Sequence, residues 1–174
     1  MTRTVPTDNR PAALDAVAAL LDRHVAFTSP EARDAVTLWA AHTHLLDTTN
    51  FTPRLLLSSP ERGSGKTRCL EVLKLLVPNP IHAVQINPAP LFRTLAYNET
   101  HTILLDEADT IFGPRSGNNP RAEELRAIIN GGWERGASVP RCVGNDHRVD
   151  HSPIFGAIAV AGIGRFPDTI LDRS

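Results

Sequence analysis

The order of apolar runs and glycine turns predicts an α/β protein in three α/β/α layers, with a mainly parallel central sheet and additional helices at the amino terminus. Short runs of strand length alternate with segments of helical periodicity between residues 55 and 106. Two of these runs, at 55–57 and 102–105, are almost wholly apolar, which is typical of strands buried on both faces. Since parallel sheets bind ligands at the carboxyl ends of their strands, we expect a site there.

Length and composition limit the possibilities. The chain has 174 residues, of which 41% are hydrophobic, enough for one compact core. A net charge of −1 gives no general argument for nucleic acid, although a local basic patch stays possible. The cysteines are Cys69 and Cys142, and no amino-terminal apolar segment or membrane-spanning run is present. We expect a cytoplasmic protein with reduced thiols and no membrane contact.

The amino-terminal part predicts two helices after a loose polar end at residues 1–10. Apolar residues from Leu14 to Val25 share one helical face, and Ser29 can cap a second helix that has Pro30 at its first position. We divide the chain into a tail and helix at 1–28 and a main domain at 29–174.

The first buried run leads into a glycine turn, Gly63-Ser64-Gly65, and then into a helix that opens with Lys66 and Thr67. Glycines let backbone N–H groups curl around an anion, a lysine adds positive charge, and a threonine hydroxyl can hold Mg²⁺. This pattern predicts a phosphate-binding loop. Pro60 occupies a position where such loops usually carry glycine, and a surface turn remains the alternative.

The second buried run ends in two adjacent carboxylates, Asp106 and Glu107. In nucleotide hydrolases the first acid holds Mg²⁺ and the second orients or deprotonates the attacking water. A solvated strand end is the alternative for one carboxylate. The two motifs together favour a nucleotide site with Thr67 and Asp106 as metal ligands.

Between and after these motifs, the pattern predicts further elements. A strand at 81–86 precedes a short helix from Pro88, and a glycine and asparagine loop covers 113–119. Asn119 and Pro120 then start a helix, followed by strands at 137–143 and 154–161.

Two other clusters are open to more than one interpretation. The segment from Cys142 to His151 has the letters of a metal site, but its glycine and asparagine favour a turn between strands. Arg135, Arg141 and Arg148 either meet phosphates in a channel or keep a hairpin soluble.

Near the carboxyl terminus, Arg173 is a candidate arginine finger, which would stabilise the γ-phosphate of a neighbouring subunit. The alternative is an ordinary surface arginine.

The GSGKT and ILLDEAD motifs, with the LDR near the end, resemble the AAA+ type of P-loop ATPase. The segments at 35–39, 52–55, 59–62 and 166–174 further resemble an ATPase module of actinobacterial and phage proteins that precedes a carboxyl-terminal domain of unknown function. That family usually has proline at the position of Pro60. The resemblance implies ATP and Mg²⁺, with Glu107 as the base, Asp106 on the metal and Arg173 acting in trans within a ring.

The chain departs from the AAA+ pattern in two places. Residues 159–162, at the end of the last expected strand, have no polar side chain to position a water. No helical lid follows the region of Arg173, which predicts an exposed adenine, weak binding and slow hydrolysis.

The leading hypothesis is an ATPase that drives DNA replication or processing in a phage or mobile element, the DNA role resting on analogy. The rival hypothesis is a non-catalytic protein that keeps the nucleotide fold. It would bind and regulate a host or phage protein through its amino-terminal helices or the loop at 113–119.

Overall fold

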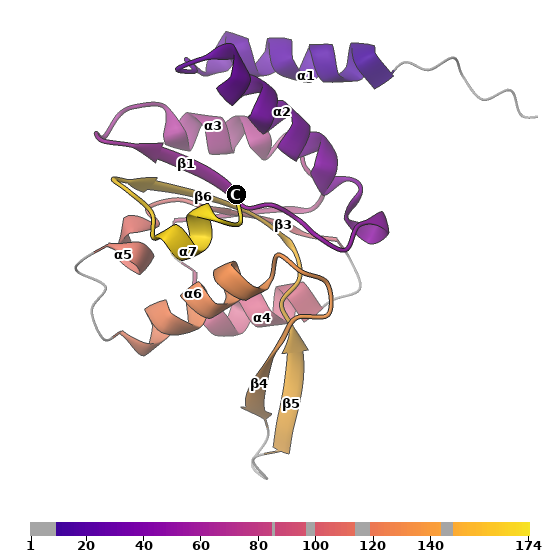
Figure 1. The fold of residues 1–174 in the computed structure, drawn as a ribbon, viewed down its shortest axis with the longest axis vertical. Coiled ribbons are helices and arrows are strands. Elements are labelled where there is room, and N and C mark those ends of the chain that lie inside the picture. The colour runs from indigo at the N-terminus through magenta and orange to yellow at the C-terminus, as the bar shows by residue number, and fades with distance from the viewer. Residues whose placement is uncertain (1–9, 85, 97–99, 114–118, 144–147) are drawn as a thin grey trace, which may run out of the picture.

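The computed structural model describes residues 10–84, 86–96, 100–113, 119–143 and 148–174 (Figure 1). The chain begins with α1 (Arg10–His24), α2 (Pro30–Thr43) and the short 3-10 helix η1 (Leu46–Thr48). An alternating part follows: β1 (Leu55–Ser59), α3 (Lys66–Leu73), β2 (Pro80–Ala83), α4 (Pro88–Ala96), β3 (Thr102–Leu105) and α5 (Asp109–Phe112). The last elements are α6 (Pro120–Gly131), β4 (Ser138–Val143), β5 (Arg148–Pro153), β6 (Ala157–Ile163) and α7 (Asp168–Leu171).

Four strands form a parallel central sheet in the order β1-β6-β3-β2. β6 lies between the strand that leads into the glycine loop and the strand that leads into the acidic pair. Leu57 is in register with Ala161, and Leu105 with Val160. The carboxyl ends of β1 and β3 therefore lie at the same edge of the sheet, with β6 between them.

The sheet is buried on both faces, as its apolar strands predict. Ala157, Ala159 and Ala161 of β6 face a core built with α1, α2 and α3. Ile158 and Val160 face a second core built with α4, α5, α6 and α7. These two groups of helices cover opposite faces of the sheet (Figure 1). The small alanine side chains leave room for α3 to pack closely on β6.

The helix caps follow the expected chemistry. The Ser29 hydroxyl accepts a hydrogen bond from the backbone of Ala32 at 3.3 Å, and the Asn119 side chain accepts one from the backbone of Arg121 at 3.1 Å. Leu21 of α1 is fully buried in the core shared with α2 and α3, so α1 packs against these two helices. Within the described ranges, no helix has the length and apolarity required to cross a bilayer.

The strand expected at 137–143 is confirmed as β4, which pairs antiparallel with β5 as a separate hairpin that projects from the body (Figure 1). β5 itself was not expected. Two other strands have different bounds from those predicted: the strand expected at 81–86 is Pro80–Ala83, and the strand expected at 154–161 is Ala157–Ile163. Apolar runs alone do not show which residues pair and which turn, so the periodicity misplaced these ends.

Candidate active site

The glycine loop has the backbone geometry of an anion cradle. Gly63 and Gly65 adopt φ values of +72° and +86°, in the left-handed region that side chains disfavour. Gly65 is the N-cap of α3, and no side chain among the described residues caps this helix. The first N–H groups of α3 are therefore available to an anion, which the helix dipole also favours.

Lys66 is held over the loop by oxygen atoms. Its Nζ donates to the hydroxyl of Ser59, to the hydroxyl of Ser64 at 3.0 Å and to the backbone oxygen of Glu61 at 3.1 Å. The Ser59 hydroxyl also joins the loop to its strand, since it accepts from Ser64 at 2.7 Å and donates to the Glu61 carbonyl. These contacts place the ammonium where a phosphate would displace neutral oxygens.

The two sequence motifs meet in one hydrogen bond. The Thr67 hydroxyl donates to Oδ2 of Asp106 at 2.6 Å, although the two residues are 39 positions apart. The other oxygen, Oδ1, accepts from the backbone N–H of Glu107 at 2.9 Å. Asp106 is only 8% exposed, so its carboxylate is held in one orientation at the strand end.

Glu107 differs from its neighbour in exposure and in backbone. Its side chain is exposed and makes no hydrogen bond or ion pair with any described residue. Its φ is +54°, a left-handed conformation that costs a residue with a Cβ about 1 kcal/mol or more. Glu107 lines a pocket at the end of β3.

That pocket has a volume of about 450 Å³ and lies at the carboxyl end of the sheet. We call it the acidic pocket. Its lining combines the loop, the strand ends and the start of α5: Arg62, Gly63, Lys66, Thr67, Asp106, Glu107, Asp109, Thr110, Gly162 and Ile163. It thus holds a lysine, a threonine hydroxyl and two adjacent carboxylates around one space.

A second, mostly apolar cleft has a volume of about 400 Å³ and shares Lys66 with the acidic pocket. Val25 and Phe27 of the α1–α2 connection, Ala32 and Val36 of α2, and Leu57 of β1 contribute apolar surface. The cleft also reaches Ser64, Gly65 and Lys66, which makes it continuous with the glycine loop.

The end of β6 explains why a polar side chain is absent there. A Cβ built on Gly162 would lie 3.2 Å from the Phe166 ring and 3.4 Å from the backbone nitrogen of Asp109. The backbone turn after β3 packs against this glycine, because Ala108 donates to the Ala161 carbonyl at 2.8 Å. A larger residue at position 162 would therefore press first on the Phe166 ring, which would have to shift by a few tenths of an ångström.

The structure does not bring Arg173 to these residues within one chain. Its carbonyl accepts from the backbone of Arg54 at 2.7 Å, at the amino end of β1, whereas the loop follows the carboxyl end. Its guanidinium donates to the Thr169 carbonyl and lies 6.0 Å from the Trp133 ring centre. Arg173 therefore has no access to the phosphate loop of its own chain.

The other basic candidates pack against rings and carbonyls. Arg135 donates to the carbonyls of Leu46 and Thr49 and lies over the Phe155 ring at 4.5 Å. Arg141 lies over the Phe92 ring at 4.2 Å. The side chain of Arg148, residues 144–147 and most of the segment expected to form a loop at 113–119 fall outside the described residues.

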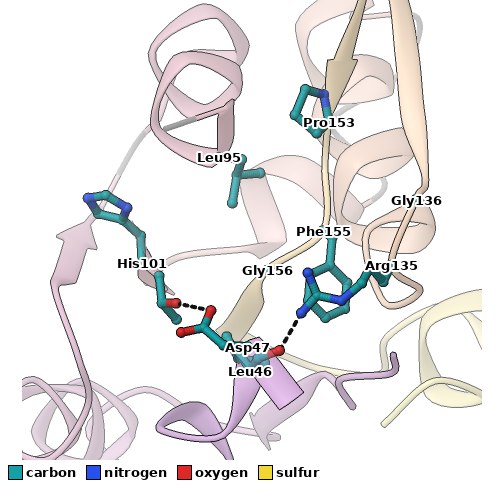
Figure 2. A pocket seen from close by; sticks show the side chains of 10 residues that line it. Leu46, Asp47, Leu95, His101, Arg135, Gly136, Pro153, Phe155 and Gly156 are labelled. Atoms are coloured by element: carbon teal, nitrogen blue, oxygen red, sulfur yellow. Dashed lines mark hydrogen bonds between the residues drawn. The ribbon is translucent and has the colours of Figure 1, made fainter. Parts of the chain in front are cut away.

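A third pocket, of about 290 Å³, lies at the amino ends of β3 and β6 (Figure 2). Arg135, Phe155 and Asp47 line it, and the Asp47 carboxylate accepts from the Thr100 hydroxyl at 2.8 Å. The described part of the chain contains no group of three His, Cys, Asp or Glu side chains placed to hold a metal ion. Cys69 and Cys142 are both free thiols, and burial raises the pKa of Cys69 to about 11.

Sequence reasoning missed two arginines. Arg62 lies inside the loop motif and lines the acidic pocket, and its place within the motif was a usable signal. Arg54 is 2% exposed and donates from Nε to the Ile129 carbonyl at 2.7 Å and from Nη1 to the Gly156 carbonyl at 2.6 Å. Burial, with a smaller effect of Arg173, lowers the pKa of Arg54 to about 9, so this guanidinium stays charged at neutral pH.

No family model matches this chain, and no curated protein matches it. Among solved structures, it is similar to a mutant of RuvB from Thermotoga maritima at 17% identity and a TM-score of 0.50, over 88% of this chain and 45% of that one. A second RuvB mutant from the same organism gives 16% identity and a TM-score of 0.46, over 82% and 42%. The chain thus spans less than half the length of these structures. At such identity the likeness concerns the fold alone: the chain has the α/β P-loop NTPase fold, with a parallel central sheet, that it shares with RuvB.

Proposed function

We propose that this chain binds ATP with Mg²⁺ at the loop of Gly63, Ser64, Gly65, Lys66 and Thr67, and hydrolyses it. The observation that carries the proposal is the 2.6 Å hydrogen bond between Thr67 and Asp106, which joins the loop to the acidic strand end. A chance surface turn gives no reason for this pairing, because β6 separates the two strands. Residues 29–174 would form the nucleotide-binding domain, with 1–28 as the preceding tail and helix.

The residues present fit a magnesium ion. Mg²⁺ prefers oxygen ligands and takes only one or two from protein, leaving the rest to phosphates and water. The Thr67 hydroxyl and the Asp106 carboxylate provide two such oxygens within 2.6 Å of each other. When bound, the ion would neutralise phosphate charge. Asp106 would stay oriented by the N–H of Glu107 while it serves as a ligand.

Glu107 is the proposed general base. Its carboxylate faces the acidic pocket, is exposed and has no hydrogen-bond partner among the described residues, so it is available to a water. It would take a proton from that water as the oxygen bonds to the γ-phosphorus and the bond from phosphorus to the bridging oxygen breaks. The products are ADP and inorganic phosphate.

The apolar cleft is the proposed position of the adenine. A nucleotide with its phosphates on the loop would extend its base over Ser64 and Gly65 toward Val25 and Phe27. This surface comes from the α1–α2 connection, so the amino-terminal helices would provide part of the cover that a lid gives in other AAA+ proteins.

We further propose that Arg173 acts on a neighbouring subunit in a ring. Its place at the far end of β1 from the loop, close to Trp133, suits contact in trans and not in cis. The resemblance in sequence extends the proposal to DNA replication or processing in a phage or mobile element, with DNA as the partner. The rival, a non-catalytic protein that binds a host or phage protein, predicts nucleotide binding without turnover.

The central test is isothermal titration calorimetry with Mg²⁺-ATP. Lys66→Ala should weaken binding by about 100-fold or more, since it removes the cation held over the loop. Lys74→Ala, at the exposed carboxyl-terminal cap of α3, is the matched control and should bind as the wild type does. Equal affinities for wild type and Lys66→Ala would refute the proposed loop.

A further inference from the structure

Arg62 lies at the turn of the loop immediately before Gly63. Its side chain is exposed and lines the acidic pocket beside Thr67, Asp106 and Glu107. It makes no hydrogen bond or ion pair with any residue that the structure describes. An arginine that neither packs nor pairs, at the mouth of a pocket lined by acids, has no evident structural role.

The acidic pocket is lined by more carboxylates than cations. Asp106, Glu107 and Asp109 contribute three carboxylates, and Lys66 and Arg62 contribute two cations. Lys66 is already directed to Ser59, Ser64 and the Glu61 carbonyl on the loop side. Arg62 is therefore the cation left to face the acidic side, where the proposed base and metal ligand lie.

The residues that line the apolar cleft and the acidic pocket also indicate which end of a bound nucleotide would lie near Arg62. The apolar cleft includes Ser64 and Gly65 but not Arg62, whereas the acidic pocket includes Arg62 but neither Ser64 nor Gly65. A nucleotide whose base lies in the cleft crosses the loop at Ser64 and Gly65 and ends in the acidic pocket. Its last phosphate, not its first, then meets Arg62.

We propose that Arg62 is a catalytic residue in cis, whose guanidinium binds the γ-phosphate of the nucleotide on its own chain. This rests on the proposed function. A planar guanidinium can donate two parallel hydrogen bonds to phosphate oxygens, and it keeps its charge at any physiological pH.

The proposed step needs no other reactant. Water bonds to the γ-phosphorus and gives its proton to Glu107, while the bond from that phosphorus to the bridging oxygen breaks and ADP leaves. Arg62 stabilises the negative charge on the transferring group throughout. A chain with such an arginine hydrolyses ATP without a neighbour, and Arg173 of a second chain would add to that rate.

The test compares ADP with adenylyl-imidodiphosphate, an ATP analogue that keeps a γ-phosphate, in calorimetry with Mg²⁺. Arg62→Ala should weaken binding of the analogue by about 10-fold or more while changing ADP affinity by less than about 3-fold. Arg62→Lys should recover only part of the lost affinity, because lysine keeps the positive charge but cannot donate two parallel hydrogen bonds as the planar guanidinium does. Arg23→Ala, an exposed arginine of α1, is the matched control and should leave both affinities unchanged.

Turnover gives a second readout at protein concentrations where light scattering shows a monomer. Arg62→Ala should lower turnover per chain by about 100-fold or more. Equal losses for ADP and the analogue, or no loss for either, would overturn the assignment of Arg62 while leaving the nucleotide site intact. A wild-type chain that binds neither ligand would overturn the proposed function itself, and Arg62 with it.

Discussion

At the amino end of the central sheet, Arg135 donates to two backbone carbonyls and lies on a phenyl ring, and Asp47 accepts from Thr100 (Figure 2). At the carboxyl end, Arg62 and Glu107 face the acidic pocket with no hydrogen-bond partner among the described residues. Both ends have pockets with charged linings. The difference is that hydrogen bonds within the protein hold Arg135 and Asp47 in the first pocket, whereas Arg62 and Glu107 in the second pocket have no such bond among the described residues.

Two arginines show the same contrast more sharply. Arg54 is fully buried, and two carbonyls, one from α6 and one from the residue before β6, accept its hydrogen bonds. It joins β1, β6 and α6 at the amino end of the sheet. Arg62 is exposed and joins nothing within the described residues. The arginine that stabilises the fold and the arginine proposed for chemistry are thus distinguished by their surroundings and not by residue type.

The largest effect expected from this comparison is on stability. Arg54→Ala should lower the free energy of unfolding by about 3 kcal/mol, because it leaves a cavity and two buried carbonyls without donors, each worth roughly 1–3 kcal/mol. Relief from burying the cation offsets part of this loss. Urea denaturation followed by circular dichroism measures the change.

Arg62→Ala is the matched variant for that experiment, and its free energy of unfolding should stay within about 0.5 kcal/mol of wild type. A loss below about 1 kcal/mol for Arg54→Ala would show that the cost of burying the charge cancels its hydrogen bonds. Arg54 would then contribute no more than Arg62 to the free energy of unfolding, contrary to the comparison above.

The next effect is on chemistry alone. Glu107→Gln keeps the size of the side chain and removes the base, so turnover should fall by about 100-fold or more while Mg²⁺-ATP affinity changes little. Phosphate release and calorimetry measure the two quantities. Loss of binding together with turnover would instead make Glu107 a metal ligand or a structural residue.

Local signals were enough to predict much of the fold and the edge of the sheet where the two motifs of the candidate site meet. Residues close together in the sequence determine several of these features. They are the helix caps at Ser29 and Asn119, the alternation of strands and helices, and the glycine loop. The expected edge for a ligand followed from the parallel sheet, because such sheets place loop and acid ends together. The 2.6 Å contact between Thr67 and Asp106 agrees with that expectation.

Features that depend on distant partners could not be predicted. The placement of β6 between β1 and β3, and the separate hairpin of β4 and β5, depend on pairing between residues far apart in the chain. The burial of Arg54 depends on Ile129 and Gly156, which lie 75 and 102 positions away. No periodicity in the sequence records such contacts, and an arginine before a strand is expected at the surface.

The smallest expected effect tests whether the acidic end stores strain. Glu107 has a φ of +54°, and its exposed side chain makes no hydrogen bond or ion pair with a described residue that would offset this cost. Glu107→Gly should relieve about 1–2 kcal/mol of strain and lose about 0.5–1 kcal/mol to the greater freedom of glycine in the unfolded chain. Glu107→Ala removes the same carboxylate but keeps a Cβ, so its strain remains.

The difference in stability between Glu107→Gly and Glu107→Ala measures the cost of the left-handed backbone conformation alone, since both variants lack the carboxylate. Glu107→Gly should be more stable than Glu107→Ala by about 0.5–1 kcal/mol, which for a chain of this size is a rise in Tm of about 1–4 °C. Both should lack turnover, since neither has a base. Equal melting temperatures would mean that the turn after β3 accepts a side chain without cost, and the left-handed Glu107 would then be a consequence of the Asp106 hydrogen bond and not a sign of function.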